Sequence, residues 1–212
     1  MTVKTRIPIS LFACLCIAAT SYAQGHVRFT FEGPPLQLPG TATVTTQYYE
    51  SGFLFRPVAG SPSFVRVGNP PTSQSGRPDN GTAYLQAAVT QSLMFNPTNG
   101  SLFGVVSVDL AEYSTGFQVP LTVSFLGYRF DGSVVTTNFT TDGIIDGTGP
   151  INDFQTFYFG SEFNNLSRVE IPTSLWSLDN LTISQIPEPT TTALLLFGGA
   201  LFAAFRFRKR KN

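Results

Sequence analysis

The sequence predicts an all-β fold, a single β-sandwich of the jelly-roll kind, for the middle of this 212-residue chain. Short segments rich in β-branched and aromatic residues alternate with turn-forming pairs such as Asn80-Gly81 and Asp131-Gly132. Several segments alternate apolar and polar residues, and none has the period of a helix. Turn signals at this density, combined with period-two alternation, are typical of sandwiches and jelly rolls.

Eleven segments are predicted strands. They are residues 27–31, 42–48, 52–56, 63–67, 82–87, 102–110, 121–130, 133–139, 154–159, 166–171 and 175–184. Within 121–130, Leu121, Val123 and Phe125 are expected on one face of the sheet. Asp131-Gly132 is expected to close a tight hairpin. The polar stretch 69–81 is predicted to be a long loop, a place where function is often found.

The first 23 residues have the three parts of a secretory signal peptide in order. Two cations, Lys4 and Arg6, precede the apolar stretch 11–20, and small residues follow. We predict that signal peptidase cuts between Ala23 and Gln24. The alternative is an ordinary buried N-terminal helix.

Cysteine and charge narrow the class of protein further. Both cysteines, Cys14 and Cys16, lie in the predicted signal peptide, so the mature body is expected to fold without a disulfide. Residues 24–184 contain six arginines, no lysine and twelve acids, which gives a formal charge of −6. An acidic body without a basic cluster excludes nucleic acid as a partner.

The last 27 residues, 186–212, have a distinct three-part order. Pro187-Glu188-Pro189 is followed by the apolar run 190–205 and then by a basic end, 206–211. The run predicts a single transmembrane helix, with its flanking arginines reaching the interface. Because Lys and Arg prefer the cytoplasmic side, the body is expected outside and the tail inside. The predicted parts are therefore a signal peptide (1–23), a β-sandwich body (24–185) and a C-terminal sorting or anchor segment (186–212).

This C-terminal order resembles the PEP-CTERM sorting signal of bacterial surface proteins. In that family an exosortase, a membrane-embedded cysteine protease, is inferred to cut near the motif and to release the protein or transfer it to the envelope. The resemblance implies that Pro187, Glu188 and Pro189 form the sorting motif and that an exosortase-type protease is a partner. It also implies an exported protein of the cell envelope or extracellular matrix, held by the membrane at least transiently. A permanent anchor is the alternative.

The body resembles the jelly-roll bodies common in such proteins, which are similar to carbohydrate-binding modules. The residues that carry the resemblance are Phe31-Glu32, the segment 49–53 and the closing strand 177–183. Such modules often hold a structural calcium ion through an acid near the first strand and an aspartate in the last. The resemblance thus implies Glu32 and Asp179 as calcium ligands, and polysaccharide as a partner.

Asp179 is also informative without the resemblance. Period-two alternation places it on the face of Leu181 and Ile183, which is expected to be the core side. A buried carboxylate is costly unless it is paired or binds a cation. Calcium is one solution, because it takes carboxylate oxygens as ligands. An ion pair with Arg129 is the other.

The sequence offers little for catalysis, so we predict no catalytic residue and no enzyme. The body has one histidine, His26, and no G-x-S-x-G motif. Asp142, Asp146 and Asp153 cluster in a glycine-rich segment and are interpreted as solvated loop acids.

Aromatic residues on a sheet face could stack on sugar rings, although for each of them a place in the sandwich core is the stronger interpretation. The candidates are Tyr48, Tyr49, Tyr84, Tyr113 and Trp176.

Three hypotheses for function follow. The first is a non-catalytic envelope or matrix protein that binds polysaccharide. The second is a secreted glycan hydrolase, which requires two carboxyl groups ~5–10 Å apart in an aromatic-lined cleft. The third is a purely structural surface protein without a small ligand.

Overall fold

The computed structural model describes residues 25–71, 76–146 and 153–185. The predicted signal peptide and its cleavage point, Ala23–Gln24, lie outside these ranges, as does the predicted sorting segment with Pro187, Glu188 and Pro189. Within the described ranges no helix has both the length and the apolar character needed to cross a membrane.

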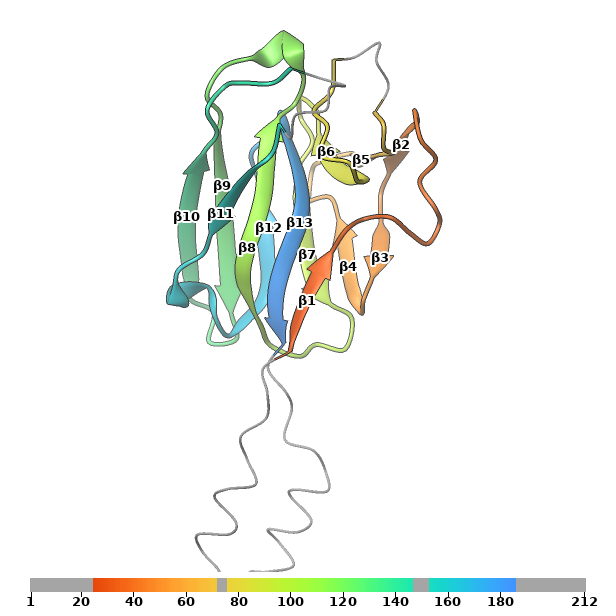
Figure 1. The fold of residues 1–212 in the computed structure, drawn as a ribbon. Helices are drawn as coiled ribbons and strands as arrows, with labels where there is room; N and C mark the ends of the chain where they lie inside the picture. The colour runs from red at the N-terminus through yellow and green to blue at the C-terminus, as the bar shows by residue number, and fades with distance from the viewer. Residues whose placement is uncertain (1–24, 72–75, 147–152, 186–212) are drawn as a thin grey trace, which may run out of the picture. The chain divides into compact units, whose positions relative to one another are not determined.

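The described residues form thirteen strands with only two short 3₁₀ turns, which confirms the predicted all-β sandwich (Figure 1). All pairs are antiparallel, and the strands lie in two layers that are linked through one residue pair, Leu166–Phe103. Sheet I contains, in order, β3 (Tyr48–Glu50), β4 (Phe53–Arg56), β7 (Leu93–Pro97), β12 (Leu166–Ile171), β9 (Thr122–Arg129) and β10 (Val134–Thr140). Sheet II contains β2 (Ala42–Thr45), β5 (Phe64–Val67), β6 (Tyr84–Ala87), β13 (Trp176–Gln185), β8 (Phe103–Glu112) and β11 (Gln155–Tyr158), with β1 (His26–Phe29) paired to the end of β13. The two 3₁₀ turns are Thr115–Phe117 and Ser161–Phe163.

Most predicted strands are found within two residues at either end, with two exceptions. The segment predicted as one strand at 42–48 is two strands, because the chain leaves sheet II after β2 and enters sheet I at β3. Strand β7 was not predicted. Its Leu93-Met94-Phe95 run is apolar without alternation and ends at Pro97, so it lacks the period-two signal of a half-buried strand.

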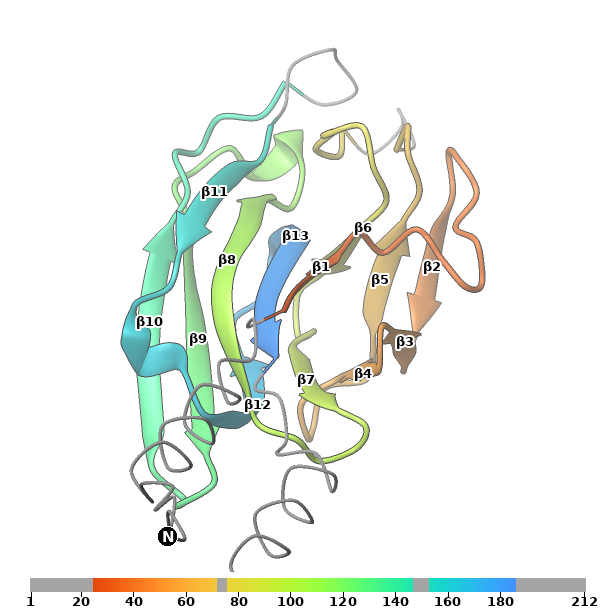
Figure 2. The same cartoon turned by 60° about the horizontal axis from the view of Figure 1, so that its bottom comes forward.

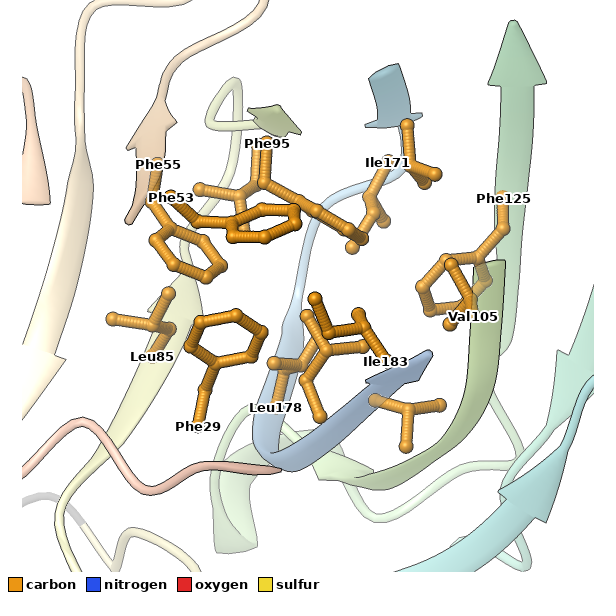
Figure 3. Close-up of a cluster of buried hydrophobic side chains, with 14 of the residues drawn as sticks. Phe29, Phe53, Phe55, Leu85, Phe95, Val105, Phe125, Ile171, Leu178 and Ile183 are labelled. Atoms are coloured by element: carbon orange, nitrogen blue, oxygen red, sulfur yellow. The ribbon is translucent and has the colours of Figure 1, made fainter. Parts of the chain in front are cut away.

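Phenylalanine rings and aliphatic side chains fill the space between the two sheets (Figure 3). Phe55 of sheet I is fully buried, and its ring centroid lies 5.2 Å from that of Phe29, which sheet II contributes through β1. It also lies 5.3 Å from Phe31 and 5.6 Å from Phe95. Edge-to-face packing of this kind adds to the stabilisation that comes from burying the rings. The core therefore holds the layers together without any cysteine in the described residues.

A smaller apolar cluster lies on the outer face of sheet II. Tyr84 of β6 packs there against Phe154, with ring centroids 5.2 Å apart. Val65, Val67 and Ala111 complete the cluster. This part of the outer face is therefore closed to solvent by the segment that precedes β11.

A bulge in β13 reverses the alternation predicted for the last strand. Asn180 has a φ of 50°, and the register between β13 and β8 shifts between Asp179 and Thr182. Leu178 before the bulge and Leu181 after it both enter the core. Asp179 thus faces away from the core, and its predicted place beside Leu181 was wrong, although it is fully buried.

The predicted hairpin at Asp131-Gly132 is confirmed. Gly132 takes a φ of 83°, and the Arg129 N–H donates to the Ser133 carbonyl oxygen at 2.9 Å. The Asp131 carboxylate accepts the Ser133 N–H at 2.9 Å and its hydroxyl at 2.7 Å. These bonds lower the pKa of Asp131 and fix the register of β9 with β10.

Candidate functional site

The outer face of sheet I carries a band of polar and aromatic side chains. Strand pairing brings Tyr49 of β3 beside Leu54 of β4, and Leu54 beside Asn96 of β7. On the other half of the sheet, Glu170 of β12 lies beside Leu126 of β9. We call this surface the sheet I face; it comprises Tyr49, Leu54, Asn96, Tyr128, Arg168 and Glu170.

Three of these side chains form a fixed cluster. The Arg168 guanidinium carbon lies 3.7 Å from the centroid of the Tyr128 ring, and Arg168 Nε–H donates to Glu170 Oε1 at 3.0 Å. The Tyr128 hydroxyl donates to Glu170 Oε2 at 2.9 Å. The arginine side chain stays 42% exposed while that of Glu170 is only 15% exposed. A planar guanidinium held this way can offer its remaining N–H donors to a ligand with little further loss of side-chain entropy.

The predicted aromatic candidates have mostly become core residues. Tyr48, Tyr84 and Trp176 are buried, so the structure contradicts a role for these three in stacking on a sugar. Tyr113 is half-buried at the end of β8. Tyr49 is 51% exposed on the outer face of sheet I and is the candidate that a ligand can reach.

Arg168, Glu170 and Tyr128 were not among the site residues predicted from the sequence. A signal was present, because Arg168 and Glu170 alternate with the apolar Val169 and Ile171 and must therefore share a polar face. Their position opposite Tyr128 comes from the β12–β9 register, which joins segments about forty residues apart along the chain and leaves no local trace.

The two predicted calcium ligands meet the same short segment, residues 80–83, from different sides. Asp179 Oδ2 accepts bonds from Asn80 Nδ2 at 2.6 Å and from Thr82 Oγ1 at 2.5 Å. Glu32 Oε1 accepts the Ala83 N–H at 2.8 Å. The predicted long loop 69–81 therefore ends in a turn that two carboxylates tie to the sandwich.

The groups around Asp179 and Glu32 are hydrogen-bond donors, which fit a hydrogen-bonded carboxylate better than a cation site. The other Asp179 oxygen, Oδ1, accepts the Asn180 N–H at 2.6 Å, so both oxygens face protein hydrogens. No three acidic, histidine or cysteine side chains in the described ranges lie close enough together to hold a metal ion. Calcium takes six to eight oxygen ligands, and a cation here would have to displace the present bonds. Calcium binding by Glu32 and Asp179 therefore stays a prediction.

The alternative partner for Asp179 was wrong. Arg129 donates through Nη2 to the Glu162 carbonyl oxygen at 2.7 Å, near the end of β9. Asp179 is instead neutralised in part by protonation, because burial raises its pKa to about 7. The three hydrogen bonds that it accepts oppose this rise, and neighbouring Asp109, its partner in the β13–β8 register, adds to it.

The glycine-rich acids are not all solvated. Asp142 and Asp146 are exposed, as expected, but Asp153 is buried and its carboxylate accepts the N–H groups of Asp79 at 3.0 Å and Asp146 at 2.9 Å. Burial raises the pKa of Asp153. The two N–H groups oppose this rise, and the nearby side chain of Asp146 adds to it. The interpretation of Asp153 as a solvated acid was therefore wrong, because it bonds backbone groups of two separate loops.

Comparison with known proteins identifies the C-terminal segment. Residues 185–211 match the PEP-CTERM protein-sorting motif. The chain carries a PEP-CTERM sorting signal. This motif belongs to exported proteins that are sorted by way of an exosortase, which confirms the resemblance and places the protein among exported, envelope-associated proteins. No curated protein matches the sequence.

Some solved structures are similar to this chain over about three quarters of its length. A family 11 carbohydrate-binding module from Clostridium thermocellum, in complex with a β-1,3-1,4-mixed-linked tetrasaccharide, has 11% identity and a TM-score of 0.34, covering 79% of this chain and 99% of its own. The CBM22-1–GH10 modules of xylanase 10B from the same organism have 10% identity and a TM-score of 0.32, and the match covers 76% of this chain and 28% of the xylanase chain. An agarase has 13% identity and a TM-score of 0.34, and the match covers 77% of this chain and 25% of the agarase chain. Similarity at this level assigns no ligand to this chain.

The raised pKa of Asp179 predicts that the body loses stability as pH rises. In the unfolded chain Asp179 titrates near its ordinary value of about 3.9, whereas in the folded state it keeps its proton to about 7. The folded state thus binds one more proton between these values, so the free energy of unfolding falls from pH 4 to pH 7, by about 4 kcal/mol at most, and then levels off. Chemical denaturation at a series of pH values, in chelator, measures the slope.

The matched variants are Asp179→Asn, which is expected to remove this part of the slope, and Asp131→Asn, which changes an exposed turn acid and is expected to keep it. An unchanged slope in Asp179→Asn would contradict the assignment.

Chelation tests the calcium prediction. An ion bound only to the folded state stabilises it, so EDTA is expected to lower the melting temperature of the wild type and to have no effect on Asp179→Asn. Readdition of calcium, and not magnesium, is expected to restore the wild-type value. Equal melting temperatures of the wild type with and without EDTA would contradict calcium binding and would mean that Asp179 acts only through its hydrogen bonds.

Proposed function

We propose that this is a non-catalytic protein of the cell envelope or extracellular matrix, whose body binds polysaccharide through the sheet I face. The signal peptide exports the body, and the C-terminal segment holds it at the membrane until an exosortase-type protease sorts it. The observation that carries the binding proposal is the Tyr128–Arg168–Glu170 cluster, which is fixed but still accessible on an open sheet face.

The chemistry of the sheet I face suits a neutral polyhydroxylated ligand. Sugar rings present apolar C–H faces and a rim of hydroxyl groups. Tyr49 offers an exposed ring, and the free N–H groups of Arg168 and the oxygens of Glu170 offer donors and acceptors. Tyr49 lies on β3, and Arg168 and Glu170 lie on β12, two strands of the same sheet with β4 and β7 between them. Because the strands belong to one rigid sheet, the spacing of these groups is set before a ligand arrives.

The acids of the body support a non-catalytic role. Asp153 and Asp179 are buried and bond backbone or amide groups, and Glu112 is buried and accepts the Gly143 N–H at 2.7 Å. Glu170 is committed to Arg168 and Tyr128. Carboxylates engaged in this way hold loops and strands, whereas a glycosidase needs two that face one substrate.

Substitution on the sheet I face is expected to weaken polysaccharide binding. Tyr49→Ala removes the exposed ring, and Arg168→Lys keeps the charge but loses the planar donor fork, so each is expected to cost about tenfold in affinity. Affinity electrophoresis of the purified protein in gels that contain mixed-linkage β-glucan, xylan or the polysaccharide of its own host measures the change.

The matched control is Tyr158→Ala, which removes a tyrosine that is 74% exposed on β11 of the other sheet, and it is expected to bind like the wild type. An equal loss in the control, or a wild type retarded by none of these polysaccharides, would overturn the binding proposal and favour a purely structural surface protein. Release of reducing ends from any of them would favour a hydrolase.

Sorting is tested by the mass of the protein isolated from its own cells. A protein processed at both ends is expected to begin at Gln24 and to lack the residues that follow Pro189. Intact-mass spectrometry reads both ends at once. A chain that ends at Asn212 would instead indicate a permanent anchor, and one that retains Met1 would contradict export through a cleaved signal peptide.

A further inference from the structure

The edge strands of the sandwich differ in a way that points to a partner. Within the described residues, five strands are hydrogen-bonded on one side only: β1, β2, β3, β10 and β11. Four of them have three or four residues, which keeps an exposed edge short. Strand β10 has seven residues and pairs only with β9 (Figures 1 and 2).

The sequence of β10 does nothing to protect this edge. Its residues, Val134 to Thr140, include no charged side chain, no proline and no glycine, and they are mostly β-branched or aromatic. Proteins usually block a long free edge with lysine, proline or a bulge, because unpaired N–H and C=O groups invite another strand. An unblocked seven-residue edge therefore indicates that the edge is used.

The direction of the free backbone groups follows from the pairing with β9. The Thr141 N–H donates to the Leu121 carbonyl oxygen, and the Ser133 carbonyl oxygen accepts the Arg129 N–H. Since these groups alternate along an antiparallel strand, the odd-numbered residues of β10 bond to β9. The even-numbered residues 134, 136, 138 and 140 turn their N–H and C=O groups outward.

The side of the sandwich next to this edge is incompletely sealed. Phe139 of β10 stacks on Phe157 of β11, with centroids 5.0 Å apart, and its centroid lies 4.9 Å from that of Phe159. These rings and Val135 pack against the core but remain partly exposed. Another strand added to β10 would cover this margin.

We propose that the free edge of β10 pairs antiparallel with the β10 edge of a second copy of this chain, centred on Thr137. The strand matches itself in that register. Val135 lies opposite Phe139, a favourable β-branched–aromatic pair on the core side. Thr136 lies opposite Asn138, and both offer outward backbone groups. A two-fold axis through Thr137 uses all seven residues and joins the two sheets I into one continuous sheet.

Acidic residues at the two ends of β10 make the proposed pairing depend on salt. The strand is uncharged, but the exposed Asp131 and Asp142 flank it, and at each end of the pair Asp142 of one copy approaches Asp131 of the other. Like charges at the ends repel, so association is expected to strengthen as salt screens them.

Single-cysteine cross-linking of the full chain tests the register directly. Cys14 and Cys16 are changed to alanine, so that the introduced cysteine is the only thiol. In the pair centred on Thr137, Thr137→Cys brings two Cβ atoms within about 5.5 Å, and mild oxidation is expected to give a covalent dimer. Thr140→Cys, on the same strand, leaves its two thiols about 20 Å apart and is expected to stay monomeric on denaturing gels.

Sedimentation velocity over a concentration series measures the association itself. The average mass of the wild type is expected to approach that of a dimer. Thr136→Lys places a charge on the exposed edge and is expected to weaken association by about tenfold or more. Val44→Lys, at an exposed position on the short edge strand β2 of the other sheet, is expected to leave association unchanged. The proposal is overturned by a wild type that stays monomeric throughout, by equal cross-linking at positions 137 and 140, or by association that Thr136→Lys does not reduce.

Discussion

The whole molecule depends on burial of phenylalanine rings between two antiparallel sheets. No disulfide strengthens the described body, so the free energy that orders the strands must come from buried apolar side chains, such as Phe29 and Phe55, whose rings meet across the layers. Because most of the strands commit one face to this core, the outward faces, the loops and the edges remain for function. These three kinds of surface are used differently in the two sheets.

Several outward-facing side chains of sheet II hold loops against the sandwich. Tyr84 and Phe154 close part of its face, and the buried Asp179 fastens the turn at Asn80 and Thr82 to the last strand. Among the residues that the structure describes, none covers Arg168 and Tyr49 of sheet I in this way, and both side chains stay partly exposed. The division explains why the acids of this acidic body are mostly structural, while the proposed binding groups lie on the opposite layer.

The sequence contained enough to predict most of the strands but not how they pair in the sheets. Turn pairs such as Asp131-Gly132 and the alternation of Val123 and Phe125 are local, and the structure confirms both. The alternation of apolar and polar residues gives no sign of the bulge at Asn180. A bulge adds one residue to a strand, so every side chain after it points to the opposite face from the one that strict alternation predicts. Burial of Asp179 was therefore predicted correctly, but its side of the sheet was not. The Tyr128–Arg168–Glu170 cluster was missed for a related reason, since it depends on the register between distant strands.

The proposed function requires that polysaccharide binds on the sheet I face. Nuclear magnetic resonance of the isotopically labelled protein, titrated with a soluble oligosaccharide of the polysaccharide that it binds, tests this residue by residue. The amide shift changes are expected to centre on β3, β12 and β9, around Tyr49, Arg168 and Tyr128. Changes that centre on β8, β11 and β13 of the other sheet would contradict it.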